Sequence, residues 1–262
     1  FQAEDGIRDS VASRGLGDVY KRQILVNGAK GRMGQEVVKA VTAAADLELV
    51  DQTDLGDDLI ARIKASQVQA VVDFTTAAVA FENTRKILEA GVHPVVGTSG
   101  LLAEQVAELQ QLAEDKGIGG LIAPNFAIGA VLLMKYAQDA AKYLPDVEVI
   151  ELHHNRKADA PSGTAVKTAQ LIAEARKEIP KALVEEKELF EGARGSEVHG
   201  VRVHSLRLPG VAHQEVIFGG TGETLTIRHD SIHRESFMPG VCLACRKVIG
   251  TQQLFYGLEH LL

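Results

Sequence analysis

The feature that most constrains the fold is a regular alternation of short apolar runs with longer helix-like segments. The apolar runs are rich in β-branched residues and end in turn residues, as strands do. They are ILVNG (24–28), LELVD (47–51), QAVVDF (69–74), HPVVGT (93–98) and GGLIAP (119–124), separated by stretches such as 79–91 and 102–117. Strands alternating with helices of this length predict βαβ units. We therefore predict an α/β fold with a Rossmann-like, doubly wound parallel sheet, an architecture that binds nucleotides.

After Asn125 the pattern changes to strands in series. The sequence predicts a helix in 127–143, a strand in DVEVIELHH, a second helix from about Ser162 to Lys177, and then three alternating strand-like runs, VRVHSLRL, HQEVIFGG and TLTIRHD. Strands in series with few helices favour an α+β domain on a mixed or antiparallel sheet. The last segment, residues 237–262, is expected to be helical and to pack on the first domain.

These patterns divide the chain into two domains and a tail. Residues 24–125 plus 235–262 are predicted to form the dinucleotide-binding domain, and residues 126–234 an inserted second domain. Residues 1–23 contain three glycines, many charges and no sustained apolar period. We expect them to be a non-native or disordered tail that resembles vector read-through.

Composition narrows the classes of function. The net charge is −7, and no apolar run approaches the ~20 residues that span a bilayer. The sequence thus gives no general electrostatic reason to bind nucleic acid or a membrane. We expect a cytoplasmic protein without a secretion signal. Its two cysteines, Cys242 and Cys245, cannot complete a structural zinc site alone and are expected to be buried and inert.

A glycine-rich turn, GAKGRMG, follows the first predicted strand. Its G-x-x-G-x-x-G spacing is a variant of the dinucleotide fingerprint, in which glycines permit a tight turn and the next helix offers N–H groups to phosphates. Asp51, at the end of the next strand, suits the adenosine ribose hydroxyls. Asp51 followed by Gln52 favours NADH, whereas Lys30 could reach a 2′-phosphate, so NADPH stays open. The alternative is a turn that serves only folding.

Two further loops, GTSG and APNF, are expected at the same edge of the sheet, where ligands of open α/β sheets bind. Phe126 is a candidate apolar wall for a nicotinamide. The predicted cofactor-binding residues are Gly28, Ala29, Lys30, Gly31, Arg32, Met33, Asp51, Gly97, Thr98, Ser99, Ala123, Pro124, Asn125 and Phe126.

The segment HHNRKADAPSGT concentrates groups that move protons or bind anions. A histidine can exchange a proton near neutral pH, and Lys157 can neutralise a carboxylate. The helix expected from Ser162 would present the N–H groups of Gly163 and Thr164 to an anion. This combination suits a small dicarboxylate, although a polar loop with a capped helix would give the same pattern.

A metal site is disfavoured in this segment. His153 and His154 are neighbours at a strand end, so their side chains point to opposite faces. The remaining histidines show no ligand spacing. We therefore predict no metal.

The segments GAKGRMG, GTSG, APNFAIG and above all ELHHNRKADAPSGTA resemble those of the 4-hydroxy-tetrahydrodipicolinate (dihydrodipicolinate) reductase family of lysine and diaminopimelate biosynthesis. The resemblance runs from about Ile24 to the C-terminus. It implies NADH- and/or NADPH-dependent reduction of a cyclic dicarboxylate to tetrahydrodipicolinate by a homotetramer. It also implies that residues 126–234 are the substrate-binding and tetramerisation domain.

The resemblance also implies residue roles. His153 would donate a proton with Lys157 in a donating or supporting role, while His154, Gly163 and Thr164 would contact substrate. Arg234 matches a basic position near the substrate carboxylates. Another NAD(P)-dependent amino-acid dehydrogenase would share the glycine turn but has no use for the histidine-lysine segment. A non-enzymatic dinucleotide sensor would bind the cofactor without turnover, and the sequence shows no DNA-reading basic helix to support it.

Overall fold

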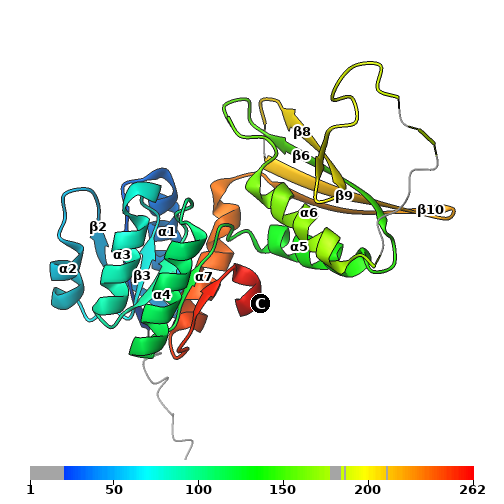
Figure 1. Ribbon diagram of the computed structural model, residues 1–262. Helices are drawn as coiled ribbons and strands as arrows, with labels where there is room; N and C mark the ends of the chain where they lie inside the picture. The colour runs from blue at the N-terminus through cyan, green and yellow to red at the C-terminus, as the bar shows by residue number, and fades with distance from the viewer. Residues whose placement is uncertain (1–20, 178–183, 186, 211) are drawn as a thin grey trace, which may run out of the picture.

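The computed structural model describes residues 21–177, 184–185, 187–210 and 212–262 (Figure 1). Residues 1–20 of the predicted tail lie outside the described residues. The first strand, β1 (Arg22–Asn27), begins before the expected Ile24. The amide of Arg22 donates to the Asp46 carbonyl at 3.0 Å, and that of Gln23 donates to the Gln69 side chain at 3.1 Å. The tail prediction was therefore wrong for these two residues, which belong to the sheet.

The first sheet has six strands in the order β11-β5-β4-β3-β1-β2, and every neighbouring pair is parallel. Its other strands are β2 (Leu47–Thr53), β3 (Ala70–Asp73), β4 (His93–Val96), β5 (Gly120–Ile122) and β11 (Leu254–Tyr256). The helices of this part are α1 (Arg32–Ala43), α2 (Leu59–Ala65), α3 (Ala77–Glu89), α4 (Ala103–Lys116) and α7 (Met238–Val248). β3 and β5 are buried throughout, as expected for parallel strands covered on both faces.

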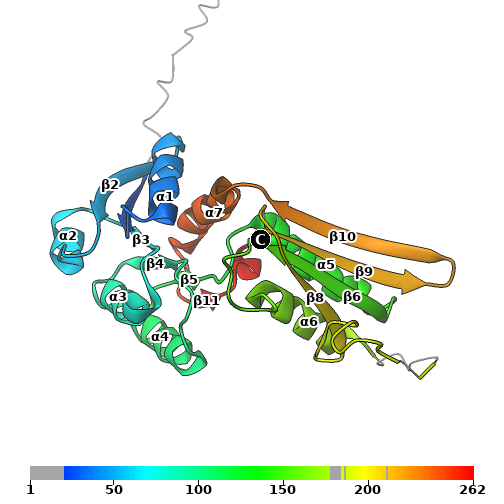
Figure 2. The ribbon, with the colours of Figure 1, turned by 90° about the horizontal axis from the view of Figure 1, so that it is seen from above.

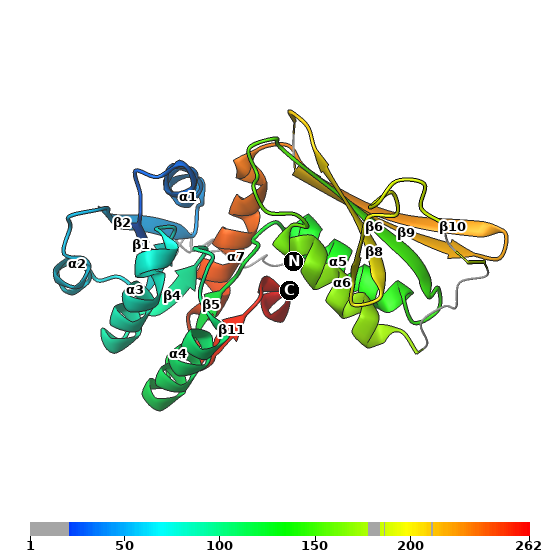
Figure 3. The same ribbon diagram turned by 45° about the horizontal axis from the view of Figure 1, so that its top comes forward.

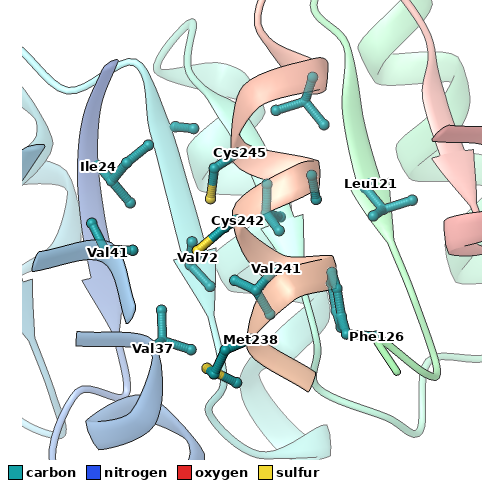
Figure 4. Packing of buried hydrophobic residues seen from close by; sticks show 14 of the residues in the cluster. Ile24, Val37, Val41, Val72, Leu121, Phe126, Met238, Val241, Cys242 and Cys245 are labelled. Atoms are coloured by element: carbon teal, nitrogen blue, oxygen red, sulfur yellow. The ribbon is translucent and has the colours of Figure 1, made fainter. Parts of the chain in front are cut away.

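Helix α7 packs beside α1 against strands β1, β3, β4 and β5 of the parallel sheet (Figure 4). Cys242 and Cys245 point from α7 toward the strands. Burial raises the pKa of both thiols, so they stay protonated and act as small apolar side chains. The expectation of buried cysteines is confirmed.

The C-terminal segment corrects the prediction of continuous helix after residue 237. α7 ends at Val248, Gly250 adopts a left-handed φ of +93°, and β11 then pairs with β5. Two short 3-10 helices, η1 (Arg234–Phe237) and η2 (Leu258–Leu261), flank these elements. A strand of three residues is too short to show an alternating pattern, and its position is set by burial of Leu254 beside the sheet.

The second sheet has five strands in the order β10-β9-β6-β8-β7. They are β6 (Asp146–His153), β7 (Ser196–Val198), β8 (Val201–Arg207), β9 (Ala212–Gly220) and β10 (Glu223–Ser231). β6 and β8 are parallel and the other pairs antiparallel, so the sheet is mixed. Helices α5 (Ile128–Ala140) and α6 (Gly163–Ala175) pack on one face of it. No helix among the described residues covers the other face (Figure 3).

The two sheets form separate bodies, and α7 and the C-terminal residues lie on the side of the first body that faces the second (Figure 2). The predicted fold class, a Rossmann-like parallel sheet with an inserted α+β part, is confirmed. None of the helices within the described residues is both long and apolar enough to cross a membrane.

Candidate active site

The glycine-rich turn requires its glycines. Gly28 has a φ of +80°, and a Cβ there would lie 2.6 Å from the carbonyl oxygen of Phe74. A Cβ on Gly34 would lie 2.0 Å from the carbonyl oxygen of Gly28. The turn at the end of β1 therefore passes too close to β3 and to the start of α1 for any side chain.

The first four amides of this turn already donate hydrogen bonds to other groups of the protein. Those of Gly28 and Ala29 donate to the Thr53 carbonyl, that of Lys30 donates to the Asp54 carboxylate at 2.7 Å, and that of Gly31 donates within the turn. Helix α1 then begins without a capping side chain or an acidic residue in its first turn. Because the first amides of a helix lack partners within it, those of Arg32, Met33 and Gly34 at the start of α1 can serve an anion.

Asp51 lies in β2 and is already paired. Arg62 of α2 binds both of its carboxylate oxygens, with Nε 2.7 Å from Oδ2, and Ser66 donates at 3.2 Å. The hydrogen bond from Arg62 is the main reason that the pKa of Asp51 lies below its ordinary value. The site thus holds a cation, Arg62, that sequence reasoning missed.

A buried carboxylate organises the loops after β3 and β4. Asp73 accepts hydrogen bonds from Asn27 at 2.7 Å and from the hydroxyls of Thr75 and Thr98 at 2.7 and 2.9 Å. A Cβ on Gly97 would lie 2.2 Å from the ring of Phe74. Thr98 and Gly97 therefore hold the loop in place, while exposed Ser99 reaches the cleft described next.

A cleft of about 750 Å³ lies between the two bodies. From the predicted residues it brings together Ser99, Pro124, Asn125, His153, Lys157, Gly163 and Thr164. Residues 256–260, which follow β11, form another part of its wall and were not anticipated. The cleft thus joins the edge of the parallel sheet to the histidine-lysine segment.

Ala123 and Phe126 do not line this cleft. Both are 1% exposed, and the Phe126 ring packs against that of Phe74 with centroids 5.8 Å apart. The sequence-based expectation of Phe126 as an accessible wall was therefore wrong, since its ring belongs to the core.

His153 ends strand β6 and is held by a buried carboxylate. Its Nδ1 lies 2.5 Å from Oε2 of Glu151, which is fully buried two residues earlier on the same face of the strand. The other oxygen of Glu151 accepts a hydrogen bond from Arg207 at 2.8 Å and one from the Ser162 amide at 3.3 Å. An imidazole that donates from Nδ1 to a carboxylate keeps Nε2 for proton exchange.

Burial would by itself raise the pKa of Glu151. Hydrogen bonds from Arg207, Ser205 and His153 outweigh it and lower that pKa, so the carboxylate stays ionised at neutral pH. Arg207 is a second residue that the sequence did not reveal, because only the parallel register of β6 and β8 places it opposite His153.

Lys157 lies in the loop after β6 and is paired with Asp159. Its Nζ is 2.8 and 2.7 Å from the two carboxylate oxygens. This hydrogen bond is the largest cause of the lowered pKa of Asp159. Because Asp159 is exposed and Lys157 lines the cleft, a bound anion could replace Asp159 as the partner.

Helix α6 begins at the cleft. The Ser162 hydroxyl caps it by accepting from the Ala165 amide at 3.3 Å, and no acidic residue lies in its first turn. No atom lies within 4 Å of a Cβ placed on Gly163. Gly163 and Thr164 are the first two residues of α6 and both line the cleft. Amides in the first turn of a helix lack partners within it, so this end of α6 can bind an anion.

A smaller cavity of about 200 Å³ adjoins the cleft and shares His153 with it. His213, His229 and Gln214 also line it. Burial lowers the pKa of His229, which favours its neutral form. His154 and Arg234 are exposed and line neither cavity, so the structure does not bring these two predicted residues to the cleft. In the part of the chain that the structure describes, no group of three or more His, Cys, Asp or Glu side chains could hold a metal ion.

Comparisons with known proteins cover nearly the whole described chain. A family model for the N-terminal part of dihydrodipicolinate reductase matches residues 22–126, and one for the C-terminal part matches residues 129–262. A protein of Listeria monocytogenes serotype 4b (strain F2365), named 4-hydroxy-tetrahydrodipicolinate reductase, is 53% identical over 261 residues, which cover 92% of this chain and 99% of the relative. A protein of the same name from Streptococcus pneumoniae serotype 19F (strain G54) is 52% identical over 252 residues, with the same coverage.

A solved structure agrees with these matches. It is a dipicolinate-bound dihydrodipicolinate reductase from Paenisporosarcina sp. TG-14, with a TM-score of 0.85 and 42% identity. The match covers 92% of this chain and 100% of that one.

Proposed function

The chain belongs to the dihydrodipicolinate reductase family, and we propose that it reduces 4-hydroxy-tetrahydrodipicolinate to tetrahydrodipicolinate with NADH or NADPH. The observation that carries this proposal is the cleft between the two bodies. It places His153, Lys157 and the N-terminus of α6 opposite the loop ends of a dinucleotide-type sheet.

A dinucleotide fits the residues at the edge of the parallel sheet. The glycine turn leaves no room for a Cβ at Gly28 or Gly34, and its helix offers the Arg32 and Met33 amides to a pyrophosphate. We assign the adenosine ribose to Asp51 and the nicotinamide end to the loops at Ser99 and Asn125. When bound, the reduced nicotinamide would supply a hydride, that is, two electrons and one hydrogen. A protein group supplies one proton, and the hydroxyl group of the substrate leaves as water.

A small dicarboxylate fits the other side of the cleft. The amides of Gly163 and Thr164 would bind one carboxylate, and Lys157 would exchange Asp159 for a substrate carboxylate. His153 would deliver the proton from Nε2 while Nδ1 stays bonded to Glu151. Closure of the two bodies on the ligand would bring exposed His154 and Arg234 to it and exclude water.

The inserted body would also carry the oligomer. We propose a homotetramer that buries the uncovered face of the mixed sheet. On this face lie Ile150, Leu152, Leu206 and Ile217, apolar side chains that are only partly shielded in the isolated chain.

The activity is tested by mixing folded protein with the freshly formed condensation product of pyruvate and aspartate semialdehyde. We expect loss of NADH or NADPH absorbance, and the same protein with His153→Ala serves as the control with reduced turnover. Folded wild-type protein that oxidises neither dinucleotide would overturn the proposal.

A further inference from the structure

We propose that Glu151 is a positioning residue that fixes the tautomer of His153. By accepting the Nδ1 proton, the Glu151 carboxylate makes Nε2 the nitrogen that exchanges a proton with substrate. This inference rests on the proposed role of His153 as proton donor.

The geometry gives the two oxygens of Glu151 different tasks. Oε1 accepts from Arg207 of β8 and from the Ser162 amide just before α6, which ties the carboxylate to two neighbouring elements. Oε2 lies 2.5 Å from His153 Nδ1. A carboxylate held on one oxygen by two other elements presents its second oxygen to the imidazole in a fixed direction.

Charge makes the assignment of the donor unambiguous. Glu151 has no exposed side-chain surface, and a buried carboxylate is stable when it is paired and hydrogen-bonded. Arg207 supplies the countercharge at 2.8 Å. An ionised carboxylate can only accept hydrogen bonds, so Nδ1 must carry the proton and Nε2 must be the site that gains or loses one.

Other charged groups face His153 from every element around it. Lys157 and Asp159 lie in the following loop and Arg207 on β8, and His213 of β9 and His229 of β10 share the small cavity. Glu259 and His260 also line the cleft. Among the described residues, the hydrogen bond of the His153 ring goes to Glu151 alone.

Strand β6 supplies a matched control on its opposite face. Glu148 also accepts hydrogen bonds from a histidine, His204 at 2.7 Å, and from an arginine, Arg194 at 2.5 Å. His204 lines neither the cleft nor the small cavity. Glu151→Gln and Glu148→Gln therefore remove the same charge from the same strand, next to the same residue types.

The experiment combines kinetics with NMR of ¹⁵N-labelled histidine in the full-length protein. In the wild type we expect the neutral ring of His153 to be the Nδ1–H tautomer. Glu151→Gln should reduce kcat by on the order of 10²-fold, the lower range of what general acid catalysis contributes. It should also populate the Nε2–H tautomer and shift the pH profile of kcat, because the amide can donate to Nδ1 and carries no charge. Glu148→Gln should change none of these, and KM for the dinucleotide should be unchanged in both variants. Oligomeric mass is measured for both variants, because Glu148 lies on the uncovered face of the sheet with Ile150 and Leu152.

The outcomes separate positioning from a structural role. A lower kcat with the wild-type tautomer and pH profile would overturn the inference, as would an unchanged kcat. If Glu151→Gln does not fold, the wild type alone decides, because a neutral His153 with its proton on Nε2 contradicts the inference directly. That measurement needs no turnover, so it is distinguishable from failure of the proposed reductase activity.

Discussion

At the residue scale, the ion pair of Arg62 and Asp51 would determine the selectivity of the proposed site between NADH and NADPH. Asp51 alone would repel a 2′-phosphate. Arg62 neutralises the charge of Asp51 in the ion pair, and it could bind the 2′-phosphate if that ion pair opened. We expect Asp51→Asn to raise the ratio of kcat/KM for NADPH to that for NADH by about tenfold, equivalent to about 1.4 kcal/mol. Arg62→Gln should lower the same ratio. Steady-state kinetics with both dinucleotides measures it, and a shift in the same direction for both variants would contradict this assignment.

Asp159 holds Lys157 in the absence of another anion, so the two residues should have opposite effects on substrate binding. Lys157→Met should raise KM for the dicarboxylate and lower kcat, because a cation is lost from the cleft. Asp159→Asn should weaken the competing ion pair and leave KM equal or lower. Calorimetric titration with dipicolinate as a test dicarboxylate gives the same comparison without turnover. Weaker dipicolinate binding in Asp159→Asn would show that the carboxylate supports the site instead of competing for Lys157.

The sequence could predict the segment that lines the cleft but not the partners of its side chains. HHNRKADAPSGT was recognisable because the residues are contiguous and end in a helix start. Glu151 lies two residues before His153, so strand periodicity could have placed both on one face. Arg207 and Arg62 could not be found this way, because strand register and helix placement depend on tertiary packing.

At the element scale, the start of α1 depends on one close backbone approach. A Cβ on Gly34 would lie 2.0 Å from the Gly28 carbonyl, whereas one on Gly31 would lie 3.1 Å from the same atom. Gly34→Ala should therefore displace α1 from β1, lower Tm and weaken dinucleotide binding by more than tenfold. Gly31→Ala, the matched control in the same turn, should have a clearly smaller effect. Calorimetric titration with NADH and thermal unfolding measure both, and equal effects would count against the backbone argument.

Strands and helices with a clear local pattern were predictable from the sequence, whereas β7 and β11 were not. Strands β1 to β5 and helices α1, α3 and α4 follow patterns that local sequence encodes. β7 and β11 have three residues each and exist because a neighbouring strand offers hydrogen-bonding groups. Short strands of this kind depend on the assembled sheet, which is why β11 was expected to be helix.

At the scale of the whole molecule, acid should destabilise the fold through paired carboxylates. Asp46 binds Arg246 of α7 across 200 residues of sequence, and this hydrogen bond is the main reason that the pKa of Asp46 is lowered. A carboxyl group with a lowered pKa binds fewer protons in the folded state than in the unfolded state. Its contribution to the free energy of unfolding is complete above the ordinary pKa near 4 and is lost as pH falls through the lowered value.

Asp46→Asn should therefore have a lower Tm than the wild type at pH 7 and a smaller loss of Tm between pH 5 and about pH 3. Because the Asp46–Arg246 pair is partly exposed, the free energy of unfolding at pH 7 should differ between Asp46→Asn and the wild type by at most about 1 kcal/mol. Glu108→Gln, an exposed change on α4, should follow the wild-type curve. Thermal melts across this pH range measure the effect, and identical slopes for Asp46→Asn and the wild type would refute it.

The uncovered face of the mixed sheet also concerns the whole molecule, because it would form the interface of the proposed tetramer. Apolar side chains on a sheet face that no helix covers are exposed to water, and association with another copy of the chain would bury them. We expect light scattering to give a mass about four times that of the 28.1 kDa chain. Ile217→Lys, which puts a charge on this face, should shift the mass toward dimer or monomer. Leu55→Lys, at a 99% exposed position on the parallel-sheet body, should leave the mass unchanged. A wild-type monomer, or a tetramer that tolerates Ile217→Lys, would place the interface elsewhere or remove it.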